Sequence, residues 1–418
     1  MIKNNQKKQT AWFQYFFLIS IFALTGFEYF FRANLLMFPI FILAGIFFVY
    51  KKCRLKGEIF LLIFPFVFIS LIQSILEYNQ NIFTTILLFI SFLTYYFIAK
   101  LVNVKFAEIF IKSVFILSVI SLIFFLLTYS GAFMSFISSK VSPYFAPIGN
   151  SGNVDALAAA RGDKNILIYN FKDYGALYNR NSGPFWEPGM FTIFVNIALY
   201  LNLMFTRRLF DIKNIIFLIT IITTLSTTGY IAVIFTLFVY SLFYSKSKLN
   251  IVYLVFLVAG TIYIANLNFM KSKVLEQINN SHHNASSRFG ASVVHYQVIS
   301  EHPITGVGDG ASRFIADLTD ADSTANGLTF VFVKYGVFLG ILYYALLLYS
   351  CINTMKYYLN KKFLGYVYFI LLLILAFSQD ITVRHFYLFL IVWGVVVINP
   401  RIGLKKYKLN HYKLDNAG

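Results

Sequence analysis

Charged residues are scarce in this 418-residue chain: Asp, Glu, Lys and Arg make up 12% of it, whereas apolar residues make up 59%. Such a composition leaves too little polar surface to cover the apolar side chains, which excludes an ordinary soluble domain. Period-two alternation, which marks spanning strands, is also absent from the apolar runs. These runs are about 17 to 25 residues long, the length that a helix needs to cross a bilayer.

Cysteine is nearly absent as well, since Cys53 and Cys351 are the only two. Both are predicted to lie near the cytoplasmic membrane surface, a reducing environment, so we expect no disulfide. The net charge of +18 is not gathered in one solvated domain, because Lys and Arg punctuate the apolar runs. A nucleic-acid partner is therefore not expected.

What is present is a series of apolar runs separated by basic residues and breakers. The sequence predicts an all-α, polytopic integral membrane protein in which residues 1–418 form a single transmembrane domain. We predict twelve spans, near residues 11–31, 33–50, 59–76, 82–99, 107–129, 189–206, 213–228, 229–245, 250–269, 326–351, 363–379 and 383–399. Residues 213–228 are short and rich in threonine, so 213–245 forms either two full spans or a broken, re-entrant element.

Lys and Arg concentrate in alternate connections, which places both termini in the cytoplasm. The basic amino-terminal stretch lacks a cleavage signature, so the first helix is expected to be retained. Two long connections, 130–188 and 270–325, then lie on the external, periplasmic face. Loops of this length usually serve a function, so we look for function there.

The first loop ends in NRNSGPFWEPGMF, which runs directly into an apolar helix. Pro188 suits the first helical turn and Glu187 suits the cap. These residues predict either a well-made helix start or, with Arg180 nearby, a carboxylate that removes a proton from a sugar hydroxyl.

The second loop holds four histidines whose spacing matches no zinc site, so surface histidines are expected at 282, 283, 295 and 302. Its GVGDG segment is either a flexible turn or an anion-binding nest formed by Gly306 and Gly308 near Arg288 or Arg313. Arg180 and Arg288 could grip a lipid diphosphate, or each could be a solvated arginine. Few ionisable residues lie deep in the spans apart from Glu28 and Lys334, both expected near helix ends, which argues against a proton-driven permease.

Three stretches between residues 175 and 345 resemble the O-antigen polymerase (Wzy) and O-antigen ligase superfamily. The first resembles its Arg, Gly and aromatic-Glu-Pro-Gly pattern, and the second, LSTTGYIA, resembles its Ser-rich break, although members often have Arg where this chain has Thr227. The third resembles its Arg, Pro-x-x-Gly-x-Gly and Asn pattern. The matching positions are Arg180, Gly183, Glu187, Pro188 and Gly189; Ser226 and Gly229; and Arg288, Pro303, Gly306, Gly308, Asn326 and Gly336.

Ligases of this superfamily place a His before the Asn, where this chain has Ala325. The departure favours the polymerase branch and leaves Glu187, Asp322 or Ser323 as acid/base candidates. The resemblance implies a GT-C-like fold and a metal-independent glycosyltransferase of the bacterial inner membrane, without a cofactor. A ligase and a repeat-unit flippase are the alternatives.

The implied reaction transfers a growing glycan from undecaprenyl diphosphate onto a lipid-linked repeat unit, and makes O-antigen, capsule or exopolysaccharide. Besides this substrate and membrane lipid, a Wzz-like chain-length regulator is an expected partner. The implied catalytic residues are Glu187, Arg180 and Arg288. The implied substrate-binding residues are Arg180, Arg288, Arg313, Gly306, Gly308, Asp322, Ser323 and Asn326.

Overall fold

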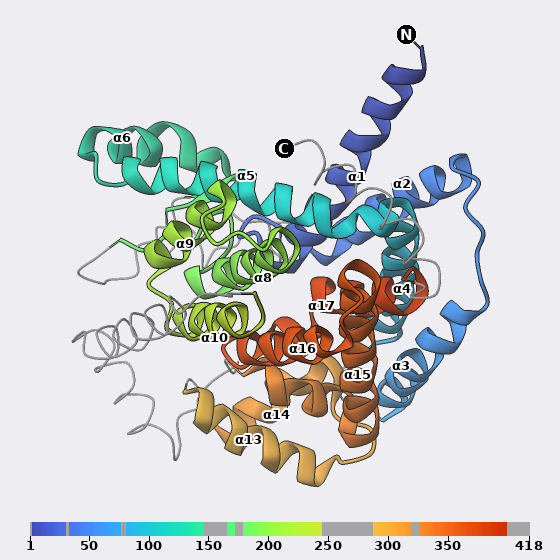
Figure 1. Cartoon of the computed structure of the whole chain (residues 1–418). Coiled ribbons are helices and arrows are strands. Elements are labelled where there is room, and N and C mark those ends of the chain that lie inside the picture. Colours follow the sequence, from blue (N-terminus) through green and yellow to red (C-terminus); the bar gives the residue numbers. More distant parts are fainter. Residues whose placement is uncertain are drawn as a thin grey trace. The chain divides into compact units, whose positions relative to one another are not determined.

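The computed structural model describes residues 2–30, 33–76, 78, 81–145, 165–171, 179–244, 287–319 and 326–398, and these are almost entirely helical (Figure 1). The chain divides into two compact units. Unit 1 comprises residues 1–40 and 107–278, and unit 2 comprises residues 41–106 and 279–418. The all-α, polytopic membrane class is confirmed, whereas a single transmembrane domain and a GT-C-like fold stay predictions.

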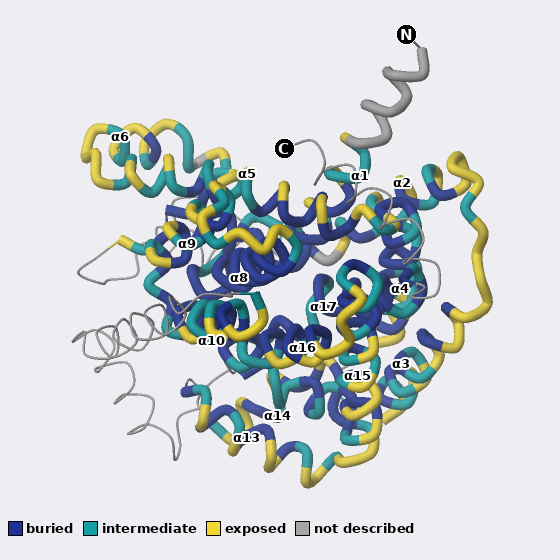
Figure 2. The backbone as a smooth tube through the Cα atoms, in the orientation of Figure 1, coloured by how far each residue is buried: buried dark blue, intermediate teal, exposed yellow. Residues whose placement is uncertain are grey.

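Unit 1 is built around α8 (Pro188–Thr206), which is buried on nearly all sides (Figure 2). Phe194 of α8 packs against Phe22 of α1 and Phe110 of α5, and α9 and α10 cover α8 further. The other elements here are α1 (Ile2–Gly26), η1 (Asn34–Leu36), α5 (Phe106–Leu127), α6 (Gly131–Phe136), the π-turn η3 (Ile137–Val141), η4 (Ser142–Phe145), the hairpin of β1 (Asn165–Ile166) and β2 (Tyr169–Asn170), α9 (Ile212–Thr224) and α10 (Thr227–Tyr244).

Unit 2 is built around α15 (Gly327–Leu359), which packs against α16 (Lys362–Ala376) and α17 (His385–Val396). Trp393 anchors the core of this unit: its indole N–H donates to the carbonyl of Asn103 at 2.9 Å. The remaining elements are α2 (Met37–Tyr50), α3 (Glu58–Ile75), α4 (Ile82–Val102), η2 (Asn103–Lys105), α13 (Arg288–Glu301), η5 (Gly308–Gly310), α14 (Ala311–Leu318) and η6 (Asp380–Val383).

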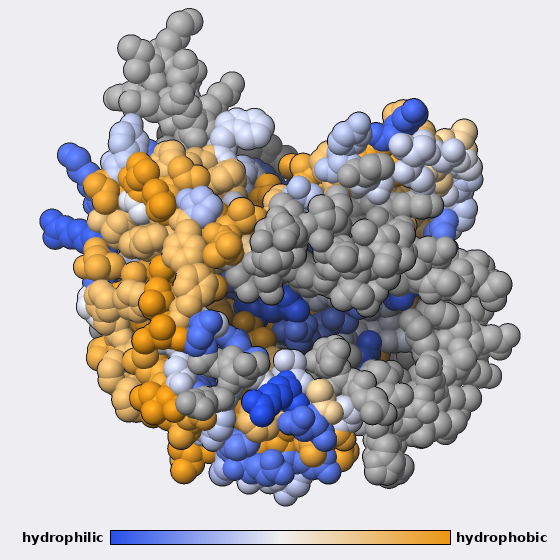
Figure 3. Space-filling view, turned by 180° about the vertical axis from the view of Figure 1, so that it is seen from behind, coloured by the Kyte–Doolittle hydropathy of each residue, from blue (hydrophilic) through white to orange (hydrophobic). Residues whose placement is uncertain are grey.

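The outer face of unit 2 is apolar where α2 and α3 lie, because large hydrophobic side chains point outward there (Figure 3). Examples are Ile46 at 57%, Leu61 at 79% and Phe64 at 66% exposure. Polar side chains gather instead at the lower end of this view, around α13 and α14. This division is the one that a bilayer imposes on a membrane protein.

Helices coincide with every predicted span except 250–269, which lies outside the described residues. Five helical stretches among the described residues are long and apolar enough to cross a membrane: Glu58–Ile75, Ile82–Leu127, Pro188–Thr206, Thr227–Tyr244 and Gly327–Leu359. The Thr-rich segment contains a break between two helices, and whether both cross the membrane stays a prediction. The helix α9 has 13 residues, about 20 Å, and ends where Leu225 adopts a left-handed conformation, before α10 begins at Thr227.

Gly336 divides α15 into two pieces. Its backbone has φ 77° and ψ 176°, a conformation that is accessible essentially to glycine alone. The pieces fold back on each other, because the Tyr344 hydroxyl donates to the Leu328 carbonyl at 2.6 Å although 16 residues separate them. In a straight helix this separation would be about 24 Å. The predicted span 326–351 is therefore divided at Gly336, and residues 337–359 form the longer piece, about 34 Å long.

Gly336→Ala should lower the free energy of unfolding by about 2 kcal/mol or more, because alanine is strained at this φ and ψ. The new methyl group would also meet the carbonyl of Ile304. Gly57→Ala is the matched control, since Gly57 has φ −58° and a Cβ there meets nothing within 4 Å. Unfolding of both variants in mixed micelles measures the difference, and equal midpoints would contradict the strained role of Gly336.

Candidate functional site

The end of the first loop is fixed in unit 1 by backbone hydrogen bonds. Phe185 pairs with Phe27 in an isolated antiparallel bridge, and their rings meet edge to face at 5.0 Å. Asn170 of β2 donates its backbone N–H to the Gly183 carbonyl at 2.7 Å and its side-chain amide to the Phe185 carbonyl at 3.1 Å. Gly183 has φ 53°, which favours glycine at this turn. The NRNSGPFWEPG motif is thus a folded segment with defined neighbours.

Arg180 lies at the carboxyl end of α9. Its Nε and Nη2 donate to the carbonyls of Thr224 and Leu225, both at 3.2 Å. These carbonyls belong to the last turn of a helix, where backbone acceptors lack intrahelical partners and a cation is favoured by the helix dipole. Asn181 adds a third link, because its N–H donates to the Thr223 carbonyl at 2.9 Å. Arg180 therefore ties the first loop to the broken helix.

Glu187 is the N-cap of α8, and Pro188 occupies the first helical position, as predicted. The Glu187 carbonyl accepts from the N–H groups of Met190 and Phe191, but its carboxylate makes no capping hydrogen bond. The residue is half-buried at the positive end of the buried helix α8. The predicted helix start is therefore confirmed, whereas a role of Glu187 as a base stays a prediction.

Arg288 is the first residue of α13, and its backbone is held by Asn326. The Asn326 amide donates to the Arg288 carbonyl at 3.2 Å and to the Ser292 hydroxyl at 2.6 Å. Its amide oxygen accepts from the N–H groups of Leu328 and Thr329, so Asn326 also caps α15. One buried side chain thus fixes the start of α13 against the start of α15. The structure gives Asn326 a positioning contact to Arg288.

His295 is completely buried, so the prediction that it is a surface histidine is wrong. Its Nδ1 lies 2.6 Å from the Thr329 hydroxyl, which makes a second link between α13 and α15. Burial lowers the pKa of His295 to about 4, because the charged imidazolium is poorly solvated there. His295 falls on the buried face of α13 with Ala291 and Val298, a helical spacing that the sequence already contained.

The Pro-x-x-Gly-x-Gly segment closes the break in α15. The Val337 N–H donates to the Pro303 carbonyl and the Val307 N–H donates to the Val333 carbonyl, each at 2.8 Å. A Cβ on Gly306 would lie 2.5 Å from the Gly336 nitrogen, so the two backbones touch where both glycines have positive φ. The N–H groups of Gly306 and Val307 are thus engaged with protein carbonyls, and the segment is a packed junction rather than a flexible turn.

The other predicted site residues have separate positions. Gly308 has φ 59° at the start of η5, and Arg313 is exposed on α14. Asp322 and Ser323 lie outside the described residues, as do Ala325 and the histidines at 282 and 283. Among the described residues no three His, Cys, Asp or Glu side chains are grouped to hold a metal ion, and a metal-independent site stays a prediction.

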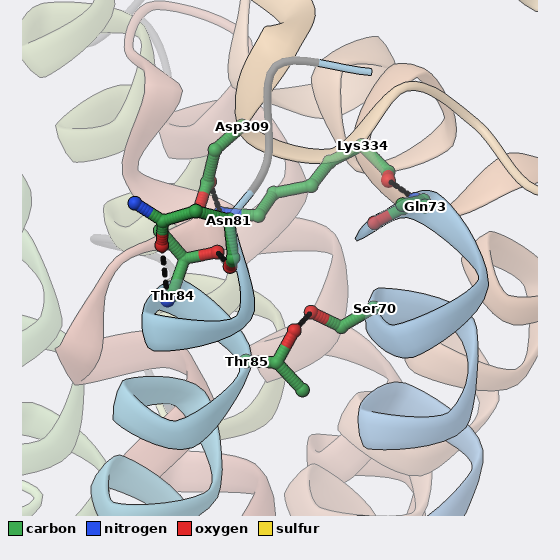
Figure 4. Close-up of polar contacts among 7 residues, drawn as sticks. All are labelled: Ser70, Gln73, Asn81, Thr84, Thr85, Asp309 and Lys334. Atoms are coloured by element: carbon green, nitrogen blue, oxygen red, sulfur yellow. Dashed lines mark hydrogen bonds and ion pairs between the residues drawn. The ribbon is translucent and has the colours of Figure 1, made fainter. Parts of the chain in front are cut away.

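Several polar residues around α15 were missed by sequence reasoning. Gln73 at the end of α3 donates to the carbonyls of Thr305 and Lys334 at 2.6 and 2.8 Å, and Lys334 pairs with Asp309 at 2.6 Å (Figure 4). Lys334 therefore lies at the end of the short piece of α15 that precedes Gly336, which agrees with its predicted position toward a helix end. Gln73 is 232 and 261 residues from its acceptors, a separation that no local motif reveals.

Acidification should destabilise the protein through His295. In the unfolded chain this side chain binds a proton near its ordinary pKa of 6.5, whereas the folded protein binds it only near 4. Protons therefore favour the unfolded state, and the contribution of His295 to the unfolding free energy should fall by about 2 kcal/mol between pH 7 and pH 5. When unfolding is measured at both pH values, the unfolding free energy of His295→Gln should depend less on pH than that of the wild type. An identical dependence would contradict this origin.

Comparison with known proteins adds one match. Residues 214–344, roughly a third of the chain, match the family model described as O-antigen ligase. The matched segment begins in α9 and ends in α15, so it includes Arg288, Asn326 and the Pro-x-x-Gly-x-Gly junction, while Arg180 and Glu187 precede it. No curated protein and no solved structure matches the chain.

This match covers the second and third of the three stretches that suggested the superfamily, and it does not distinguish a ligase from a polymerase. Similarity to this family indicates in general an O-antigen ligase-like or polymerase-like function. Residues 214–344 of this multi-pass membrane protein are similar to the O-antigen ligase family, which is consistent with the Wzy and O-antigen ligase superfamily.

Proposed function

We propose that the protein is a polysaccharide polymerase of the bacterial inner membrane, with both termini in the cytoplasm. It transfers a growing glycan from undecaprenyl diphosphate onto a lipid-linked repeat unit on the external face. A hydroxyl of the acceptor repeat attacks the anomeric carbon, and the bond from that carbon to the diphosphate oxygen breaks. The electron pair leaves with the diphosphate, while the hydroxyl proton passes to a base.

Arg288 carries this proposal. It begins α13 within the matched segment, and Asn326 and the Ser287 cap fix the backbone around it. A guanidinium on a fixed backbone can offer its planar fork to phosphate oxygens with little loss of entropy. Preorganised donors of this kind stabilise the charge that develops on a leaving group. We assign Arg288 to the diphosphate, and Arg313, Gly308, Asp322 and Ser323 to the substrate in the same loop.

Arg180 and Glu187 are the proposed groups in unit 1. Arg180 is held by the carbonyls at the end of α9, which orients its guanidinium, and we assign it to the diphosphate as well. Glu187 is assigned as the base that accepts the hydroxyl proton, because it is half-buried at the start of α8, next to the first loop. Gly306 and Asn326 support the reaction through the backbone positions they fix.

A ligase is the second candidate, because the matching family model is described as O-antigen ligase. Ala325 in place of the histidine that the ligases carry favours the polymerase. The two activities act at different steps. A polymerase lengthens the lipid-linked glycan, whereas a ligase moves the finished glycan to another acceptor.

Deletion of the gene should therefore leave only single repeat units on the surface and on the lipid carrier. The reason is that the transfer joining one repeat to the next would be lost. Gel profiles of surface glycan, together with mass spectrometry of extracted lipid-linked saccharides, measure this. Long lipid-linked chains that accumulate unattached would instead identify a ligase and overturn the polymerase proposal.

Arg288→Ala and Arg180→Ala should lower the polymerisation rate about 10²- to 10³-fold, since each removes a charged donor from the leaving group. Arg288→Lys should recover part of the rate, because it keeps the charge but loses the planar fork. Arg208→Ala is the matched control, as Arg208 is exposed between α8 and α9. Complementation of the deletion strain measures ladder length.

Membrane abundance of each variant is measured in parallel, because Arg180 also ties the first loop to α9. Wild-type ladders in both alanine variants at normal abundance would refute the assignment of the two arginines.

A further inference from the structure

Two ion pairs of unit 2 take no part in the function proposed above. Lys334 Nζ lies 2.6 Å from Asp309 Oδ1, and Arg384 Nη2 lies 2.8 Å from Asp380 Oδ2. Figure 4 shows the Lys334 side chain extended from α15 toward Asp309. All four side chains are partly accessible, with Asp309 the most exposed at 45% and Lys334 the least at 20%.

The two pairs are neighbours. Asp309 belongs to η5 and Asp380 to η6, and both elements pack against α15, which carries Lys334. Two cations and two carboxylates therefore share one region, and their formal charges sum to zero. Such pairs contribute little to stability when they are partly exposed, so stability alone gives a weak reason for them.

Tyr335 adds an independent observation. Its side chain is 2% exposed, and its hydroxyl has no hydrogen-bond partner among the described residues. The charges of both Lys334 and Asp309 act on this hydroxyl, and the Lys334 ammonium lies 5.9 Å from the ring centre. Buried phenol hydroxyls normally have a partner. The Tyr335 hydroxyl beside the first ion pair therefore lacks, among the described residues, the partner that such a group normally has.

The charge balance indicates the class of ligand. An anion would be attracted by Lys334 and Arg384 but repelled by the two carboxylates beside them. A sugar hydroxyl both donates and accepts, so it can bond to carboxylates, cations and a phenol together.

We propose that Asp309, Lys334, Asp380, Arg384 and the Tyr335 hydroxyl form a binding site for the hydroxyl groups of a neutral oligosaccharide. Asp309 accepts hydrogen bonds from the sugar, and Lys334 positions its carboxylate. That this sugar is the repeat unit rests on the proposed function. The chemistry of this site differs from that of Arg180 and Arg288, which are assigned to the diphosphate.

The test uses the purified full-length protein in lipid nanodiscs and calorimetric titration with two probes. One probe is the oligosaccharide released by mild acid from the host's own lipid-linked repeat units, and the other is inorganic diphosphate. Asp309→Asn and Tyr335→Phe should each weaken oligosaccharide binding about tenfold and leave diphosphate binding as in the wild type. Glu108→Gln, which alters the exposed Glu108–Lys112 pair of α5, is the matched control and should change neither.

Tyr335→Phe is the sharper variant, because it removes only a hydroxyl that has no partner among the described residues. Its thermal midpoint should equal or exceed that of the wild type, which separates ligand binding from a structural role. Unchanged oligosaccharide binding in both variants would overturn the site. So would a wild-type protein that does not bind the oligosaccharide, or a selective loss of diphosphate binding. A wild-type protein that binds the oligosaccharide while its gene deletion leaves full-length glycan would refute the polymerase and retain the sugar site.

Discussion

A helix that is interrupted within a membrane protein must find partners for the N–H and C=O groups that the interruption frees, because hydrocarbon supplies none. This chain has two such interruptions, one between α9 and α10 and one at Gly336 within α15. In each unit a polar loop supplies the missing partners. The loops that carry the candidate site are therefore held in place by the same hydrogen bonds that make the breaks possible.

The two interruptions are closed by different chemistry. At the end of α9 the freed groups are carbonyls, and Arg180 satisfies two of them with a charged donor that also suits the helix dipole. At Gly336 the break frees the Val333 carbonyl and the Val337 N–H. The Val307 N–H donates to the first, and the Pro303 carbonyl accepts from the second. Close backbone approach requires glycine on both sides, which explains Gly306 and Gly336 physically. The motifs are thus as much architectural as chemical.

Hydropathy predicted the helices well, because each apolar run must cover hydrocarbon whatever its partners are. Hydropathy placed Gly336 inside a span, because hydropathy averaged over a window of residues does not reveal a single residue with positive φ. The role of Asn326 as a cap could have been predicted from its place directly before an apolar helix. The contacts of Gln73 could not, because they depend on how α3 packs against α15.

Transfer of a glycan from a lipid diphosphate requires an enzyme to hold two unlike groups, one strongly anionic and one neutral and rich in hydroxyls. A surface of arginines binds the first strongly but discriminates poorly among sugars, since each guanidinium only donates. A balanced cluster of carboxylates, cations and a phenol offers both donors and acceptors, and it has no net attraction for phosphate. In unit 2 both kinds of group are attached to α15, because Asn326 links it to Arg288 while Lys334 and Tyr335 belong to it. The short piece before Gly336 can therefore hold Arg288 and the cluster around Lys334 at a fixed separation. Glycan transfer between two bound partners requires such a fixed geometry.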